Sequence, residues 1–130
     1  MTNSNVVDVN GKEVYIEYVH KYDDKPTLVF LHDSLGCTQL WRDFPKKLAE
    51  KTQTNILVYD RVGYGKSSPM ETFVRPTHYM ELEADFLNDL LLKLNSKNAI
   101  LFGHSDGGTI ALLTASKYPD NIKAVICEAG

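Results

Sequence analysis

Four short runs of apolar residues recur along the chain and limit the folds that it can adopt. They occupy residues 27–31, 55–59, 99–102 and 122–127. Strands that are apolar along their whole length are typical of a parallel sheet with both faces covered. Two further strands are indicated by residues 6–9 and 13–19, which flank the turn signal Asn10-Gly11 and predict a hairpin.

Segments with helical spacing separate the four apolar runs. The first extends from Trp41 to Leu48, and Pro45 suits the first turn of a helix there. The second spans residues 77–95, and the third spans residues 105–118. This alternation of strands and helices predicts an α/β fold, with a mostly parallel sheet and helices on both faces.

The segment 77–95 has the clearest amphipathic pattern. Its apolar stripe comprises Tyr79, Leu82, Phe86, Leu87, Leu90, Leu91 and Leu94. The opposite face carries Glu81, Asp85, Asn88 and Asp89. We therefore expect the apolar stripe, Leu82 included, to pack against the sheet and the polar face, Asn88 included, to be exposed.

Composition excludes several classes of protein. The chain has 130 residues, which suits a single domain, and 17 acidic against 14 basic residues give a formal net charge of -3. This balance lacks the basic surface of a nucleic-acid-binding protein, and no apolar run is long enough to cross a membrane. No secretory leader is visible. We therefore expect a cytoplasmic protein whose two cysteines, Cys37 and Cys127, are reduced, partly buried thiols.

The sequence Gly103-His104-Ser105-Asp106-Gly107-Gly108 contains the pattern G-x-S-x-G between an apolar run and a helical segment. In that context the pattern predicts a sharp strand–turn–helix bend with the serine hydroxyl at the carboxyl end of the strand. The helix N-terminus would offer N–H donors and a positive dipole end to a developing oxyanion. Ser105 is therefore the candidate nucleophile, and a purely structural glycine turn is the alternative. We expect a structural role for His104, since adjacent residues on a tight turn point apart.

A second polar segment, His32-Asp33-Ser34, ends the apolar run 27–31. Together with the serine motif it resembles the α/β-hydrolase superfamily, in which a backbone N–H of this loop completes the oxyanion hole. The resemblance implies that Ser34 and Asp106 are the two backbone donors, although Asp33 stands where glycine is usual. For His32 we favour a role in bracing the loop over a direct catalytic role.

The segment from Tyr59 to Ser68 is similar to the D-x-x-G-x-G-x-S sequence of the same superfamily. The resemblance implies that Asp60 and Arg61 brace loops near the site and that Tyr64 faces the pocket. Gly65-Lys66-Ser67 also resembles the end of a phosphate-binding P-loop. However, the glycine that must open a P-loop falls at Asp60, so the sequence argues against nucleotide binding.

The catalytic base is not found in the sequence. In this superfamily the order along the chain is nucleophile, acid, histidine, whereas all four histidines here precede Ser105. Glu128 lies near where some relatives carry the acid, but no histidine follows for it to orient. We therefore expect residues 1–130 to be the N-terminal part of a single α/β-hydrolase domain, truncated after about the sixth strand, without the C-terminal strands, the cap and the triad histidine.

The resemblance implies a serine hydrolase that cleaves an ester, lactone, amide or carbon–carbon bond of a small-molecule substrate, with little activity for this chain alone. It implies no metal or organic cofactor, and no cluster of Cys and His has metal-ligand spacing. The alternative is a non-catalytic fragment or binding module that associates through its open sheet edge, either with itself or with a C-terminal complement.

Overall fold

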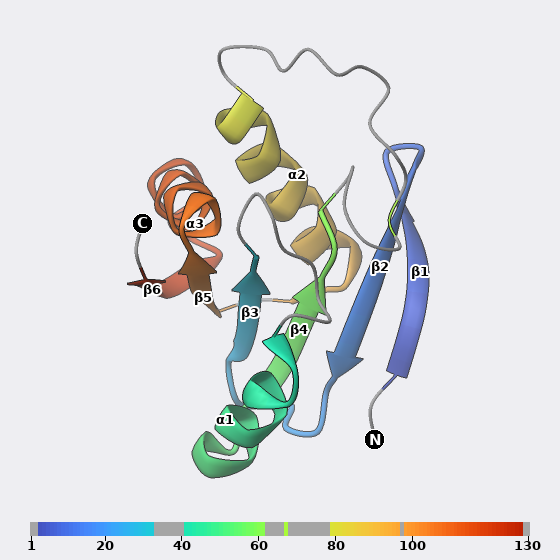
Figure 1. The fold of residues 1–130 in the computed structure, drawn as a ribbon, viewed down its shortest axis with the longest axis vertical. Helices are drawn as coiled ribbons and strands as arrows, with labels where there is room; N and C mark the ends of the chain where they lie inside the picture. Colours follow the sequence, from blue (N-terminus) through green and yellow to red (C-terminus); the bar gives the residue numbers. More distant parts are fainter. Residues whose placement is uncertain (1–2, 33–40, 62–66, 68–78, 97, 129–130) are drawn as a thin grey trace.

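The computed structural model describes residues 3–32, 41–61, 67, 79–96 and 98–128 (Figure 1). Six strands and three helices alternate in this part of the chain. In order they are β1 (Asn3–Val9), β2 (Lys12–Val19), β3 (Thr27–Leu31), α1 (Phe44–Thr52), β4 (Asn55–Tyr59), α2 (Tyr79–Lys93), β5 (Ala99–His104), α3 (Asp106–Lys117) and β6 (Ile122–Glu128). All six expected strands and all three expected helices are present, with ends shifted by a few residues.

The six strands form one sheet in the order β1-β2-β4-β3-β5-β6. Neighbouring strands among β4, β3, β5 and β6 are parallel, whereas β2 is antiparallel to both β1 and β4. Each parallel connection passes through a helix, because a parallel partner cannot be reached by a tight turn. The expected α/β fold with a mostly parallel sheet is therefore confirmed.

The β1–β2 hairpin turns at the two residues that the sequence indicated. Asn10 and Gly11 both have positive φ, 54° and 85°, and Val9 pairs with Lys12 on the other side of the turn. Such a two-residue turn matches the twist of the strands. The Asn10 side chain also donates a 2.7 Å hydrogen bond to the Asp89 carboxylate, which ties the hairpin to α2.

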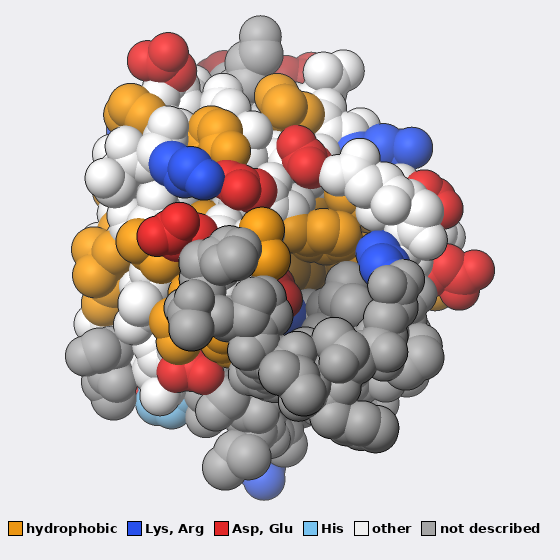
Figure 2. Space-filling view, turned by 90° about the horizontal axis from the view of Figure 1, so that it is seen from above, with side chains coloured by type: hydrophobic (Ala, Val, Ile, Leu, Met, Phe, Trp, Pro, Cys, Tyr) orange, Lys and Arg blue, Asp and Glu red, His pale blue; other side chains and the backbone are white. Residues whose placement is uncertain are grey.

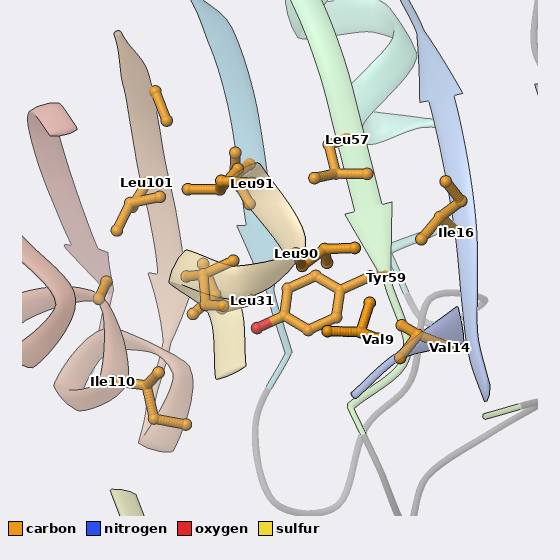
Figure 3. Packing of buried hydrophobic residues seen from close by; sticks show 14 residues of the cluster. Val9, Val14, Ile16, Leu31, Leu57, Tyr59, Leu90, Leu91, Leu101 and Ile110 are labelled. Atoms are coloured by element: carbon orange, nitrogen blue, oxygen red, sulfur yellow. The ribbon is translucent and has the colours of Figure 1, made fainter. Parts of the chain in front are cut away.

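Side chains of the central strands alternate between two apolar layers. One layer lies between the sheet and the pair α2 and α3, and the other lies between the sheet and α1. Figure 3 shows part of the first layer, with residues of β3, β4 and β5 beside residues of the helices: Leu31, Tyr59, Leu101, Leu90, Leu91 and Ile110. Helices therefore cover both faces, as expected. Each fully buried leucine contributes about 1.5–3 kcal/mol to folding.

Two expectations for α2 were wrong. Leu82, expected in the buried stripe, is 47% exposed, and Asn88, expected on the exposed face, is only 6% exposed. Asn88 is buried because it has a polar partner from another part of the chain. Its side chain accepts a 3.0 Å hydrogen bond from the side chain of Asn121, in the connection that leads to β6. A buried amide is stable there because it has a partner.

The expected partial burial of the thiols was also wrong where the structure tests it. Cys127 is a free, exposed cysteine on β6, a strand whose side chains are mostly exposed or partly exposed. Burial failed because, within the described residues, β6 pairs only with β5. Cys37 lies outside the described residues.

No helix in the described part of the chain is both long enough and apolar enough to span a bilayer.

Candidate active site

Three adjacent parallel strands end at the same edge of the sheet. His32 follows β3, Asp60 and Arg61 follow β4, and His104 and Ser105 stand at the end of β5. The carboxyl ends of parallel strands are where open α/β sheets place their ligand sites. Figure 2 looks onto this end of the molecule, where hydrophobic side chains of described residues reach the surface among acidic ones. Ser34 and Tyr64, also predicted for this site, lie outside the described residues.

The turn at Ser105 has an uncommon backbone conformation. Its φ is 55° and its ψ is -116°, a combination that residues with a Cβ rarely adopt. The surrounding backbone holds it in place: the Ser105 N–H donates to the Glu128 carbonyl at 2.8 Å, and its own carbonyl accepts from the Gly108 N–H at 2.9 Å. The side chain is partly exposed. Strain of this kind persists only where neighbouring contacts enforce it.

The two glycines of the pattern allow β5, α3 and the end of β3 to interlock. A Cβ on Gly103 would overlap the carbonyl group of Gly107, and a Cβ on Gly107 would overlap the carbonyl oxygen of Leu31 and stand 2.8 Å from that of His32. Both obstacles are backbone, which cannot move aside as a flexible side chain could. Glycine is therefore required at both positions by the close approach of the chain.

The helix that follows the turn supplies donors at the strand edge. Asp106 is the first residue of α3, and Ser105 is its N-cap without a side-chain capping bond. The first N–H groups of a helix have no acceptor within the helix, and the helix dipole places partial positive charge there. The turn can therefore favour negative charge that develops beside Ser105.

His32 joins the ends of two strands. It is 2% exposed, and its Nε2 accepts a 3.0 Å hydrogen bond from the backbone N–H of Arg61. A nitrogen that accepts carries no proton, so the neutral ring carries its proton on Nδ1. This contact fixes the chain after β3 against the chain after β4, and it occupies a ring nitrogen that a base would need.

A buried arginine connects β4 to α2 and α3. The Arg61 side chain is fully buried, and its Nη1 lies 3.4 Å from the Tyr79 hydroxyl, which in turn lies 3.4 Å from Oδ2 of Asp106. Burial alone would lower the pKa of Arg61, but the hydrogen bond to Tyr79 and the attraction of Tyr59 and Glu83 outweigh it and raise that pKa. In the sequence, Tyr79 stands out only as a member of an apolar stripe, and no spacing rule could have linked its hydroxyl to Asp106.

His104 pairs with the acidic residue that ends β6. Its Nδ1 lies 2.9 Å from Oε1 of Glu128, and both side chains are more than one third exposed. The pair joins the last residue of β5 to the last residue of β6, in parallel with the backbone bond from Ser105 to Glu128. From the sequence, Glu128 was a candidate only for the triad acid, and its pairing with His104 was not predicted.

Ser67 forms hydrogen bonds that connect β2 to the residue after β4. Its hydroxyl accepts a 2.9 Å hydrogen bond from the Tyr15 N–H and donates to the Asp60 carbonyl, while the Asp60 N–H donates to the Tyr15 carbonyl at 3.0 Å. The serine that completes Gly65-Lys66-Ser67 is therefore held by backbone groups. Among the described residues, no three His, Cys, Asp or Glu side chains gather as a metal site would require.

Comparison with known proteins gives concordant results. A proline iminopeptidase of Lactobacillus helveticus is 32% identical over 124 residues, covering 92% of this chain and 40% of the peptidase. The serine hydrolase BPHL of Mus musculus is 32% identical over 122 residues, with the same two coverages. The crystal structure of a CIB-like hydrolase from Thermoplasma acidophilum has a TM-score of 0.87 at 21% identity, covering 98% of this chain and 62% of that one. At that identity the structural likeness shows the fold alone.

The matches cover different fractions of this chain and of its relatives. The chain spans about 40% of the length of the curated relatives named above, whereas they match nearly all of it. A family model described as the alpha/beta hydrolase fold matches residues 26–130, which include every described site residue. The chain belongs to the alpha/beta hydrolase fold family.

Proposed function

We propose that this chain carries the nucleophile and the oxyanion-binding groups of a serine hydrolase, with Ser105 as the nucleophile. The observation that carries the proposal is the backbone of Ser105, held at φ 55° and ψ -116° between β5 and the N-terminus of α3. A strained strand–turn–helix bend of this kind presents a serine hydroxyl at the edge of the sheet. If the segment were only a structural glycine turn, the strained conformation of Ser105 would have no function.

The proposed reaction passes through an acyl-serine. The Ser105 hydroxyl attacks the acyl carbon while its proton passes to a base, and the carbonyl oxygen becomes an oxyanion. The bond from the acyl carbon to the leaving group then breaks, and the leaving group takes the proton. Water attacks the resulting ester in the same way, which releases the acid and restores Ser105.

Two backbone N–H groups are proposed to hold the oxyanion. One belongs to Asp106, whose place at the start of α3 leaves its N–H without an acceptor in the helix. The second is assigned to Ser34 from the family resemblance. His32, Asp60, Arg61 and His104 are proposed to brace the loops around them.

The base and its orienting acid are proposed to lie in parts of the protein outside these 130 residues. All four histidines precede Ser105 in the chain, and the described contacts of His32 and His104 serve the loop after β4 and the end of β6. The relatives named above include a peptidase and a serine hydrolase, which do not narrow the substrate to one kind of bond. The proposed substrates are therefore acyl compounds in general: esters, lactones, amides and compounds cleaved at a carbon–carbon bond.

A fluorophosphonate probe tests the nucleophile directly, because it phosphonylates an activated serine. We expect slow labelling of the chain that rises when imidazole is added as an external base, and mass spectrometry should place the adduct on Ser105. Ser105→Ala is the control and should remain unlabelled under the same conditions. Absence of labelling in a folded chain, or equal labelling of Ser105→Ala, would overturn the proposal.

The second candidate function is association through β6. In the described part of the chain this strand pairs on one side only, and Ile126 is 46% exposed. An open edge with apolar side chains is suited to pairing with another strand. The two candidates predict different results, since an association module requires no reactive Ser105.

A further inference from the structure

The residue after the proposed nucleophile carries a charge that opposes the reaction. Asp106 has its carboxylate roughly 3–5 Å from its own backbone nitrogen, by covalent geometry alone. If that N–H receives an oxyanion, as the proposed function requires, a second negative charge lies close to the first. Like charges at such a distance repel strongly where water is excluded. The Asp106 carboxylate therefore needs a partner that turns it away and offsets its charge.

The structure supplies that partner from two other elements. The Tyr79 hydroxyl, at the first residue of α2, lies 3.4 Å from Oδ2 of Asp106 and can donate to it. Behind it, the buried Arg61 guanidinium donates to the same hydroxyl oxygen from 3.4 Å. A donor polarised by a buried cation binds a carboxylate more strongly than an isolated hydroxyl does.

We infer that Tyr79 is a positioning residue for the proposed reaction: with Arg61 behind it, it holds the Asp106 carboxylate away from the oxyanion and leaves the Asp106 backbone N–H free to bind it. This inference rests on the proposed function. It assigns to Tyr79 a role that neither the sequence motif nor the family membership states. It also gives the buried charge of Arg61 a purpose at the site.

A purely structural role, that of joining α2 to α3, is already filled elsewhere. The Tyr118 hydroxyl donates to the Asp85 carboxylate at 2.6 Å, and the Lys117 ammonium donates to the same oxygen at 2.7 Å. These contacts join the same two helices at the other end of α3. Tyr118→Phe is therefore a matched control, because it removes the same kind of tyrosine–aspartate bond between the same helices, away from Ser105.

The test is a double-mutant cycle on the rate of fluorophosphonate labelling with imidazole present. Tyr79→Phe should slow labelling about tenfold when residue 106 is Asp. When residue 106 is Asn, the same substitution should change the rate by less than about twofold, because no charge remains to be held. Tyr118→Phe should leave the rate unchanged.

The outcomes separate the inference from the function on which it depends. An equal loss in the Asp and Asn backgrounds, or no loss in either, would overturn the role of Tyr79 while Ser105 remained the nucleophile. A parent chain without labelling at Ser105 would end both proposals before the variants were compared. If Tyr79→Phe does not fold, Tyr79→Gln keeps a donor and Tyr79→Leu does not; faster labelling of Tyr79→Gln supports the inference, and equal rates refute it.

Discussion

Ser105 combines an unfavourable backbone conformation with the position that the chemistry requires. At φ 55° and ψ -116° its Cβ is crowded by the backbone, and strain of this type costs about 1–3 kcal/mol. Glycine has no Cβ and adopts positive φ freely. The backbone conformation of Ser105 therefore suits its proposed role but lowers the stability of the chain.

We accordingly predict that Ser105→Gly stabilises the chain while removing all labelling by the fluorophosphonate probe. The free energy of unfolding should rise by about 1 kcal/mol relative to Ser105→Ala, which removes the hydroxyl but keeps the strained Cβ. Urea unfolding of the two variants at one temperature measures the difference. Equal stabilities would mean that the backbone at residue 105 is not strained in solution.

Connections between elements depend on single polar side chains that have several partners. Asn55, at the start of β4, is fully buried and serves the connection from β2 to β3. Its Oδ1 accepts from the N–H groups of Lys21 and Tyr22 at 2.7 and 2.9 Å, and its Nδ2 donates to the carbonyls of Tyr22 and Lys25 at 2.8 and 3.2 Å. One amide thereby satisfies four backbone groups.

Asn55→Ala should therefore destabilise the chain by about 2–4 kcal/mol, since it leaves those backbone groups without their partner beside a cavity. Asn5→Ala is the control, because Asn5 is exposed and its side chain serves only the adjacent N–H of Val6 among its described bonds. Thermal unfolding of the two variants provides the comparison. Similar small effects would show that the connection does not depend on Asn55.

The link between α2 and α3 should depend on pH through Asp85. Hydrogen bonds from Lys117 and Tyr118 hold the pKa of Asp85 below its ordinary value of 3.8. A carboxyl whose pKa is lowered by folding contributes stability above the unfolded pKa and loses it as the pH falls through the folded pKa. Asp85→Asn should therefore lower the melting temperature at neutral pH, and the difference from the parent chain should close below pH 3.8. In a Tyr118→Phe chain, which lacks one of the two hydrogen bonds to Asp85, the same substitution should lower the melting temperature less at neutral pH.

For the whole molecule, the two edges of the sheet allow a comparison of exposed apolar strands. Ile126 on β6 is 46% exposed and Val6 on β1 is 47% exposed, so one substitution at each edge changes a similar amount of surface. We predict concentration-dependent association that Ile126→Lys weakens and Val6→Lys does not, because β6 is a parallel, largely apolar strand with a free side in the described chain. Sedimentation velocity over a range of concentrations measures it. A monomer at all concentrations in every variant would argue against association through β6.

Much of the fold was predictable because the signals were local. Runs 27–31 and 55–59 are apolar after their first residue, and all of their residues are buried, as in a strand covered on both faces. The turn at Asn10-Gly11 needs positive φ at both residues, which these residue types tolerate. The pattern around Ser105 combined glycines with a strand and a helix, which is why the bend could be placed to the residue.

The remaining features depend on contacts between distant segments. Asn88 is buried because Asn121 reaches it from 33 positions away, and Leu82 is exposed because no described element covers its side of α2. The contact of Tyr79 with Asp106 joins residues 27 positions apart. Such pairs have no periodicity, so they emerge only when helices and strands have been placed in space.

The hairpin turn also contains a site of slow deamidation. In an Asn-Gly pair the backbone nitrogen of Gly11 can attack the side-chain carbonyl of Asn10, expel ammonia and leave, after water adds, an acidic residue in place of an amide. The Asn10 amide now donates to the Asp89 carboxylate at 2.7 Å, so ageing would replace an attraction with a repulsion at the tether between hairpin and α2. The isoelectric point and the melting temperature of the protein should therefore fall during storage. Isoelectric focusing of stored samples would measure the rate of deamidation. An Asn10→Gly variant, which cannot deamidate at this position, is the control.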